Sequence, residues 1–162
     1  KYSGIWRNDV TRNANMILLD KGELKLNGGA LKPVAGGAFM LGERKLTFNN
    51  GSPMTARIAN PDGSVTRLTL VSEWKPAATD LTEFAGEWYS EEAQAAFTIK
   101  IEGDKAFITQ RPTLKLPLQP IYKDHFSAQG FVAWFTRDAS GKIASLHIGG
   151  GRMRDMLFER KR

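Results

Sequence analysis

The feature that most constrains the fold of this sequence is an internal repeat, because blocks of the first half recur in the same order in the second half. Residues 2–6 (YSGIW) and 84–88 (FAGEW) share the pattern aromatic-x-Gly-x-Trp. Residues 31–39 (LKPVAGGAF) and 118–126 (LQPIYKDHF) share a leucine, a proline, an aliphatic residue and a phenylalanine at identical spacing. Matching blocks that recur in the same order indicate a structural unit used more than once. We therefore predict two tandem copies of one folding unit.

The repeat also predicts where the copies begin and end. The first copy is expected to span residues 1–76 and the second residues 84–162. Residues 77–83 are expected to form a linker that contains one helical turn. Asp80 and Glu83 have capping-box-like spacing for this turn.

Both copies have the local pattern of antiparallel strands. Short stretches of β-branched, aromatic and aliphatic residues alternate with Gly, Asn and Asp turn signals. In the second copy this pattern predicts strands at residues 86–91, 95–102, 105–110, 114–121, 125–129, 131–138, 142–149 and 153–160. Alternation turns side chains such as Ile99, Leu114 and Ala144 inward. About eight strands allow a sheet to close, so we predict an all-β fold of two eight-stranded antiparallel up-and-down barrels of lipocalin-like form, filled by side chains.

Composition excludes some functions and limits others. The chain has no cysteine, so disulfides and thiolate chemistry are excluded. The formal net charge of +6 is compatible with an anionic partner. However, no basic stripe is interleaved with aromatic residues, so we expect no nucleic-acid partner. No apolar run approaches the roughly 18 residues needed to cross a bilayer, so we expect no membrane span.

The residues that match catalytic motifs stand in settings that do not suit catalysis. Ser72 and Lys75 have Ser-x-x-Lys spacing, which requires a helix, but they lie at a strand end just before Pro76. His147 matches a His-x-Gly motif, but alternation turns it outward toward solvent. His125 and His147 lack the i, i+4 spacing of a helical zinc site. We therefore predict no catalytic, cofactor-binding or metal-binding residues, and no enzyme activity of the isolated chain.

The first strand of each copy carries the residues with the clearest structural role. Trp6 follows Gly4 by two positions, and this placement lets the indole ring plug one end of a barrel. Trp88 follows Gly86 in the same way. Arg160 lies on the last predicted strand, which closes beside the first in an up-and-down barrel. We expect Arg160 to stack on Trp88 in a cation–π contact worth about 0.5–2 kcal/mol. No arginine holds the corresponding place in the first copy, so this contact is not expected to repeat.

Seven segments carry a resemblance that covers nearly the whole chain. They are YSGIW at 2–6, KGELKLNGG at 21–29, LKPV at 31–34, NPDG at 60–63, LTEFAGEW at 81–88, LPLQP at 116–120 and LFER at 157–160. In this order they resemble the C-terminal accessory regions of serine β-lactamase-like hydrolases, a group of penicillin-binding proteins, D-aminopeptidases and class C-like esterases. In D-aminopeptidases of this group, two eight-stranded barrels follow the catalytic domain and can restrict access to its active site. The resemblance implies the same layout here, although the group's Tyr-x-Asn motif is absent.

These observations predict a noncatalytic accessory region whose partner is an upstream catalytic domain in the same chain, and which modulates substrate access. Lys1 lies opposite Glu83 in the repeat, so we expect further sequence before it. By analogy with such hydrolases, the expected location is periplasmic or secreted. The Gly-x-Trp pattern with an arginine on the last strand also resembles lipocalins and fatty-acid-binding proteins. The alternative function is therefore a lipocalin-like module that binds a small apolar ligand.

Overall fold

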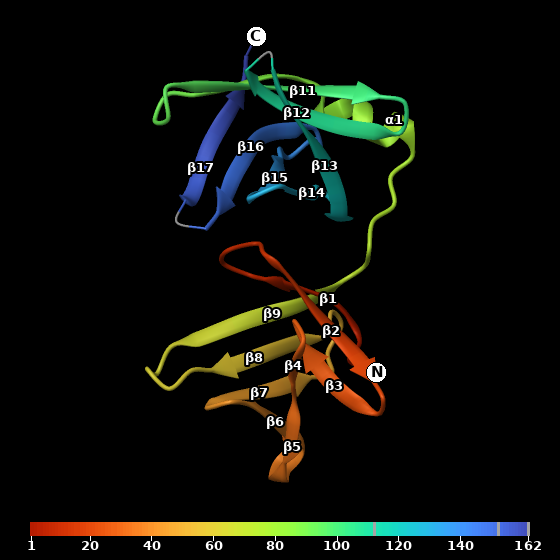
Figure 1. Ribbon diagram of the computed structural model, residues 1–162, viewed down its shortest axis with the longest axis vertical. Helices are drawn as coiled ribbons and strands as arrows, with labels where there is room; N and C mark the ends of the chain where they lie inside the picture. The colour runs from red at the N-terminus through yellow and green to blue at the C-terminus, as the bar shows by residue number, and fades with distance from the viewer. Residues whose placement is uncertain (112, 152, 162) are drawn as a thin grey trace. The chain divides into compact units, whose positions relative to one another are not determined.

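The chain is an all-β protein in the computed structural model, which describes residues 1–111, 113–151 and 153–161 (Figure 1). It divides into two compact units, residues 1–73 and 74–162. The helical segments are short and comprise η1 (Ala35–Gly37), α1 (Ala78–Leu81) and η2 (Thr82–Phe84).

The second unit is a closed, antiparallel barrel of eight strands. The strands are β10 (Gly86–Ser90), β11 (Ala95–Glu102), β12 (Lys105–Arg111), β13 (Leu114–Tyr122), β14 (His125–Ala128), β15 (Phe131–Arg137), β16 (Ile143–Gly150) and β17 (Met153–Arg160). They follow one another around the barrel in chain order, and β17 pairs with β10 to close it. Each strand matches one predicted from the sequence, with both ends within one residue of the predicted position. Turn signals and apolar alternation therefore predict this unit correctly.

Large side chains fill the interior of this barrel. Trp88, Phe126 and Phe158 have no exposed surface. Phe84 is equally buried and packs edge-on against Phe135, with ring centroids 4.7 Å apart. The other buried members of the cluster are Leu81, Ile99, Ala106, Ile108, Leu118, Ala133, Leu146 and Ile148. Because burial of apolar surface contributes about 25 cal/mol per Å², this cluster stabilises the unit.

Irregular pairing displaces two side chains that alternation alone would turn inward. Leu114 is 45% exposed, because the pairing of β12 with β13 shifts between Thr109 and Arg111, the register partner of Leu114. Ala144 is also exposed, because the pairing of β15 with β16 shifts at Arg137 and leaves Ala144 without a partner. A bulge inserts one residue and interrupts the alternation. The inward prediction is therefore wrong at both positions.

A helical lead-in, formed by α1 and η2, precedes the second barrel and overlaps the predicted linker. The carboxylate of Asp80 accepts a hydrogen bond from the N–H of Ala77 at 2.9 Å, at the start of α1. Glu83 lies in η2, where its carboxylate accepts a hydrogen bond from Arg137 Nη1 at 2.8 Å. The helical turn therefore begins before Asp80, rather than between Asp80 and Glu83.

The first unit is a nine-stranded antiparallel sheet with one interruption. Its strands are β1 (Gly4–Asn8), β2 (Ala14–Asp20), β3 (Glu23–Leu26), β4 (Gly29–Ala30), β5 (Lys32–Val34), β6 (Ala38–Leu41), β7 (Arg44–Asn49), β8 (Thr55–Ala59) and β9 (Val65–Val71). The sheet order is β4-β3-β2-β1-β9-β8-β7-β6-β5, so β4 and β5 are its two edges. Only Leu31 separates these edges along the chain. The unit therefore differs from the predicted closed barrel of eight strands by a break at Leu31.

The break has a local cause in the turns on either side of it. Gly28 adopts a left-handed backbone with φ of 85°, and Gly36 does the same with φ of 78°. Only residues 29–34 remain between these turns, and β4 and β5 share them. The undivided strand β13, in contrast, has nine residues and pairs with both β12 and β14. Leu31 is 1% exposed, so its side chain packs in the core at the break.

Aromatic and aliphatic side chains also form the core of the first unit. Trp6 and Ile17 have no exposed surface. Phe48 stacks on Tyr2 with ring centroids 3.9 Å apart. The other buried members are Leu26, Leu31, Leu46, Ala56, Ile58 and Leu68.

Candidate functional site

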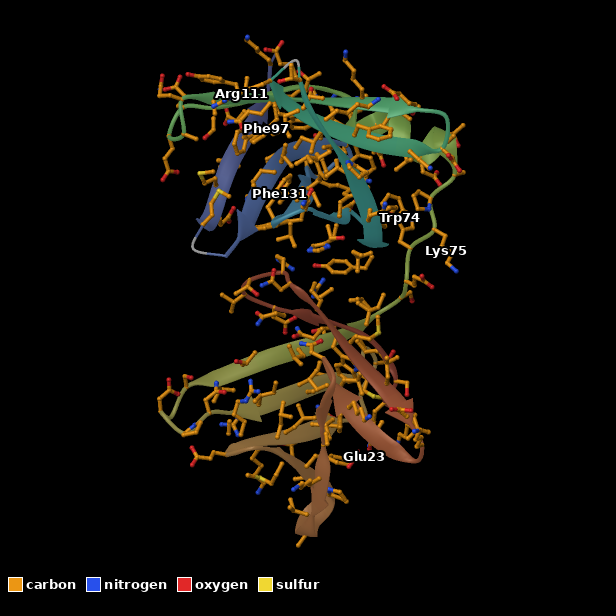
Figure 2. All side chains as sticks on the ribbon, in the orientation of Figure 1. Glu23, Trp74, Lys75, Phe97, Arg111 and Phe131 are labelled. Carbon is orange, nitrogen blue, oxygen red and sulfur yellow. The ribbon has the colours of Figure 1, made fainter. Side chains whose placement is uncertain are left out.

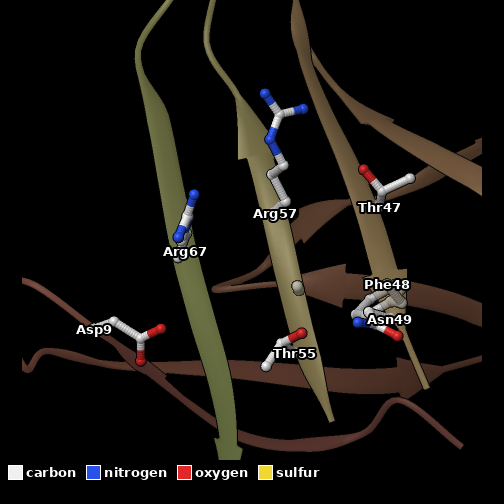
Figure 3. A pocket seen from close by; sticks show the side chains of 8 residues that line it. Asp9, Thr47, Phe48, Asn49, Thr55, Arg57 and Arg67 are labelled. Carbon is white, nitrogen blue, oxygen red and sulfur yellow. The ribbon is translucent and has the colours of Figure 1, made fainter. Parts of the chain in front are cut away.

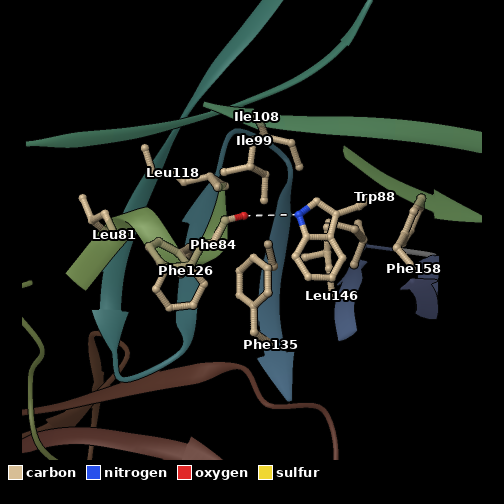
Figure 4. Packing of buried hydrophobic residues seen from close by; sticks show 13 residues of the cluster. Leu81, Phe84, Trp88, Ile99, Ile108, Leu118, Phe126, Phe135, Leu146 and Phe158 are labelled. Carbon is tan, nitrogen blue, oxygen red and sulfur yellow. Dashed lines mark hydrogen bonds between the residues drawn. The ribbon is translucent and has the colours of Figure 1, made fainter. Parts of the chain in front are cut away.

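Each unit buries a tryptophan on its first strand. On β1, the indole Nε1 of Trp6 donates a hydrogen bond to the carbonyl oxygen of Tyr2 at 2.9 Å. On β10, Nε1 of Trp88 donates to the carbonyl oxygen of Phe84 at 3.2 Å (Figure 4). In both cases the acceptor belongs to an aromatic residue four positions earlier. Because its only polar group is satisfied, each ring can be buried completely.

Arg160 covers the Trp88 ring in the second unit. Its Cζ lies 4.5 Å from the ring centroid. The guanidinium also donates hydrogen bonds to the carbonyl oxygens of Ala85 and Glu83, both at 2.6 Å. These carbonyls stand at the end of η2, where a helix leaves acceptors unpaired. Arg160 therefore joins the last strand to both the lead-in and the core by charge-assisted contacts.

The glycines before the tryptophans are favoured by their backbone conformation, and the space beside each is tight. Gly86 has φ of 136°, and a Cβ there would lie 3.1 Å from Arg160 Nη1. Gly4 has φ of 146°, and a Cβ there would lie 3.0 Å from Leu70 Cδ1. Leu70 is the register partner of Trp6. An apolar side chain thus takes, in the first unit, the place that Arg160 holds in the second. The five predicted plug residues lie in two structural clusters, one in each unit.

Trp74 belongs to the second unit, although no repeat or motif in the sequence singles it out. Its ring packs edge-on against Phe84 and Phe126, with centroids 5.9 and 5.7 Å apart (Trp74 is labelled in Figure 2). The backbone N–H of Trp74 donates to the carbonyl oxygen of Ile121 at 3.1 Å. The only signal that could have placed it is its apolar character in an otherwise polar connection.

A serine, a histidine and an aspartate are linked by hydrogen bonds on the outer face of the second barrel. Ser145 Oγ lies 3.0 Å from His147 Nε2, and His147 Nδ1 lies 2.7 Å from Asp155 Oδ1. The atoms follow the order found in Ser-His-Asp hydrolases. Trp134 stacks on the imidazole with centroids 5.3 Å apart. His147 faces outward as predicted, but Trp134 shields it and leaves its side chain 16% exposed.

The surroundings of Ser145 do not resemble those of a catalytic nucleophile. Its hydroxyl also hydrogen-bonds to the hydroxyl of Thr136 on β15. Ser145 lies in β16, with Thr136 and Glu159 as register partners on the two sides. Acyl transfer needs N–H donors directed at the developing oxyanion, whereas the backbone here belongs to strands paired on both sides. We interpret this cluster as a cross-strand polar network that fixes the register of β15, β16 and β17.

The Ser-x-x-Lys letters lie in an extended segment. Ser72 directly follows β9, and Lys75 lies in the irregular segment before α1. The chemistry of this motif requires both side chains on one face of a helix. The structure therefore does not place Ser72 and Lys75 in that arrangement.

His125 is a buried histidine whose ring nitrogens have no hydrogen-bond partner. It is 1% exposed, and neither Nδ1 nor Nε2 contacts a donor or acceptor among the described residues. Its ring stacks on Tyr122 with centroids 4.3 Å apart, and Trp134 is its register partner on β15. Burial lowers the pKa of His125 from 6.5 to about 4, since an apolar setting disfavours the charged imidazolium.

A hollow of about 480 Å³ lies over β7, β8 and β9 on the outer face of the first unit (Figure 3). Arg57 and Arg67 stand on its neighbouring strands β8 and β9. The other polar residues that line it are Asp9, Thr47, Asn49 and Thr55. The sequence alone did not identify this group, because the residues come together only through strand register.

A second hollow in the first unit reaches its core. It has a volume of about 410 Å³, and the buried side chains of Leu26, Ile58 and Leu68 line it. Asn8 and Arg44 contribute polar groups to the same hollow. Its lining is more polar than apolar, because Asn15, Asn27 and Thr66 also line it.

Among the described residues, no three His, Cys, Asp or Glu side chains gather closely enough to hold a metal ion. In the same part of the chain, no helix has the length and apolar character needed to cross a membrane. The sequence matches no model of a known protein family. A search of curated proteins likewise finds no relative. Function is therefore inferred from the residues and geometry of the chain itself.

Proposed function

We propose that this chain is a noncatalytic, two-barrel accessory region of a β-lactamase-like serine hydrolase. In this proposal the region packs on an upstream catalytic domain of the same chain and modulates substrate access. The observation that carries the proposal is the matched construction of the first strands of the two units. The resemblance of the sequence to accessory regions of these hydrolases supplies the family.

Local geometry supports an internal repeat of two lipocalin-like barrels. β1 pairs with β2 and β9, just as β10 pairs with β11 and β17. Each first strand begins at a glycine of positive φ and buries a tryptophan bonded to a carbonyl four residues earlier. If β4 and β5 are counted as one interrupted strand, both units have eight strands in the same order. These correspondences favour one ancestral unit used twice.

The settings of the potential catalytic groups support a noncatalytic role. Ser145 is held between paired strands, and Ser72 lies in an extended segment. His125 is buried and stacked on Tyr122. None of these three residues combines an accessible nucleophile with a base and an oxyanion site, as acyl transfer requires. An accessory region needs no such centre, because its partner supplies it.

The mass of the native protein tests the proposal directly. The chain has a mass of 18.0 kDa. We expect an immunoblot of source cells, made with an antibody against this chain, to show a band far above that mass. A single band at the mass of the chain would contradict the accessory role.

Removal of the region from the native protein tests its effect on access. We expect the shortened enzyme to hydrolyse a small chromogenic ester and to change its kcat/KM for larger substrates, because the region shapes the route to the active site. Adding the chain back is expected to restore the original kcat/KM. If the added chain neither binds the catalytic domain nor changes kcat/KM, the proposal is wrong.

One observation favours the alternative, a lipocalin-like module for a small apolar ligand. The hollow of about 410 Å³ in the first unit reaches the buried side chains of Leu26, Ile58 and Leu68. The aromatic filling of the second barrel makes the first unit the better candidate. Saturable binding of a fluorescent fatty acid that is lost in the Leu68→Gln variant, with the fold retained by circular dichroism, would favour this alternative.

A further inference from the structure

Two arginines face each other across neighbouring strands of the first unit. Arg57 on β8 and Arg67 on β9 are direct register partners, and both are exposed. Like charges at directly opposed positions of an antiparallel pair destabilise the sheet. Among the described residues, no carboxylate lies within 4.0 Å of either guanidinium. The pair thus has an electrostatic cost that no neighbouring side chain offsets.

The surface around the two arginines is rich in hydrogen-bond donors. Thr47 is the register partner of Arg57 on the other side, on β7. One row along the sheet, Thr55 lies between Asn49 and Thr69. Hydroxyl and amide groups therefore border the arginine pair on two sides, and Thr47, Asn49 and Thr55 line the same hollow of about 480 Å³ (Figure 3).

The single acidic residue that lines the hollow is already engaged. Asp9 Oδ1 accepts a hydrogen bond from Thr69 Oγ1 at 2.8 Å and lies 3.4 Å from Arg7 Nη2. Its backbone N–H donates to the carbonyl oxygen of Arg67 at 3.0 Å. The negative charge of Asp9 is thus paired with Arg7. The excess positive charge of Arg57 and Arg67 remains on the strands beside it.

We propose that this hollow binds a compact oxyanion, the carboxylate or phosphate group of a small molecule, between Arg57 and Arg67. Each guanidinium presents a planar fork of donors that matches two oxygens of such a group. The hydroxyls of Thr47 and Thr55 supply further donors to the anion. A bound anion relieves the electrostatic repulsion between Arg57 and Arg67. This relief adds to the affinity of the site for the anion. This site is independent of the accessory role and stands whether or not that role is correct.

An NMR titration of the whole chain tests the site with inorganic phosphate as the probe. We expect saturable shifts in the backbone amides of β8 and β9 at constant ionic strength. The variant Arg57→Gln with Arg67→Gln is expected to bind phosphate at least tenfold more weakly. A matched control removes two exposed charges from the second unit, Lys100→Gln with Arg111→Gln, and is expected to retain the wild-type affinity. Equal weakening of phosphate binding in both double variants would mean that net charge alone causes the effect, and this result would overturn the site.

A second arm of the titration distinguishes the two oxyanions. Succinate replaces phosphate under the same conditions. The anion that binds more tightly identifies the chemical class of the ligand. Absence of saturable shifts at β8 and β9 with both anions would overturn the proposal.

Unfolding by urea without added anion separates a binding role from a structural one. Arg57→Gln is expected to have a midpoint equal to or higher than the wild type, because it removes the cross-strand repulsion. A clear fall in this midpoint would assign Arg57 a structural contact instead and contradict the proposal.

Discussion

The variant Trp88→Ala is expected to lower the free energy of unfolding of the second unit by about 3–5 kcal/mol, the usual cost of removing a large buried aromatic ring. Trp88 has no exposed surface and packs against Phe135 with centroids 5.5 Å apart. Its loss also leaves the carbonyl oxygen of Phe84 without a donor and removes the ring under Arg160. Urea unfolding followed by far-ultraviolet circular dichroism measures the change.

Trp134→Ala is the matched control, since it removes the same side chain from the outer face of the same barrel. Trp134 is half-buried and its main ring contact is the stack on His147. We expect a loss less than half that of Trp88→Ala. Equal losses of stability in the two variants would show that the interior position of Trp88 does not make it more important for stability than Trp134. The loss of stability in Trp88→Phe should lie between the losses in Trp134→Ala and Trp88→Ala, because phenylalanine keeps most of the side-chain volume but not the hydrogen bond.

The second unit could be predicted strand by strand because its turn signals are frequent and its strands alternate regularly. Where the prediction failed, the cause was pairing. Ala144 has no register partner at a bulge, and a bulge depends on two strands at once. Trp74 is a similar case, because its contacts with Phe84 and Phe126 form only after the barrel has folded.

The first unit shows the limit of reasoning from a repeat. The matching blocks predict an undivided strand around Leu31, yet the turns at Gly28 and Gly36 leave six residues, 29–34, for β4 and β5 together. The glycines were visible in the sequence, but glycine does not reveal which φ it adopts. The break therefore required the structure.

The candidate sites depend on register more than on sequence spacing. Period-two alternation puts Ser145 and His147 on one face, but Asp155 reaches His147 only through the pairing of β16 with β17. The pairing of Arg57 with Arg67 likewise follows from the register of β8 with β9. Residues that are distant in the chain meet here without any motif. A single sequence could not have predicted either group.

His125 is expected to make the protein less stable as the pH falls from 7.5 toward 4. Its pKa is about 4 in the folded state against 6.5 as its ordinary value. Below pH 6.5 the unfolded chain binds a proton that the folded protein does not bind until about pH 4. The stability that the neutral ring permits at pH 7.5 is thus lost across this interval. The full difference amounts to about 3 kcal/mol, at 1.36 kcal/mol for each pKa unit.

Variants of the two histidines assign this pH dependence. His125→Phe keeps an aromatic ring against Tyr122 but cannot be protonated, so its loss of stability between pH 7.5 and 5 should be smaller than that of the wild type by roughly 2 kcal/mol. His147→Phe retains His125 and should keep that part of the wild-type slope. Urea unfolding at both pH values measures each difference. If His125→Phe declines as steeply as the wild type, the buried imidazole is not the group that responds.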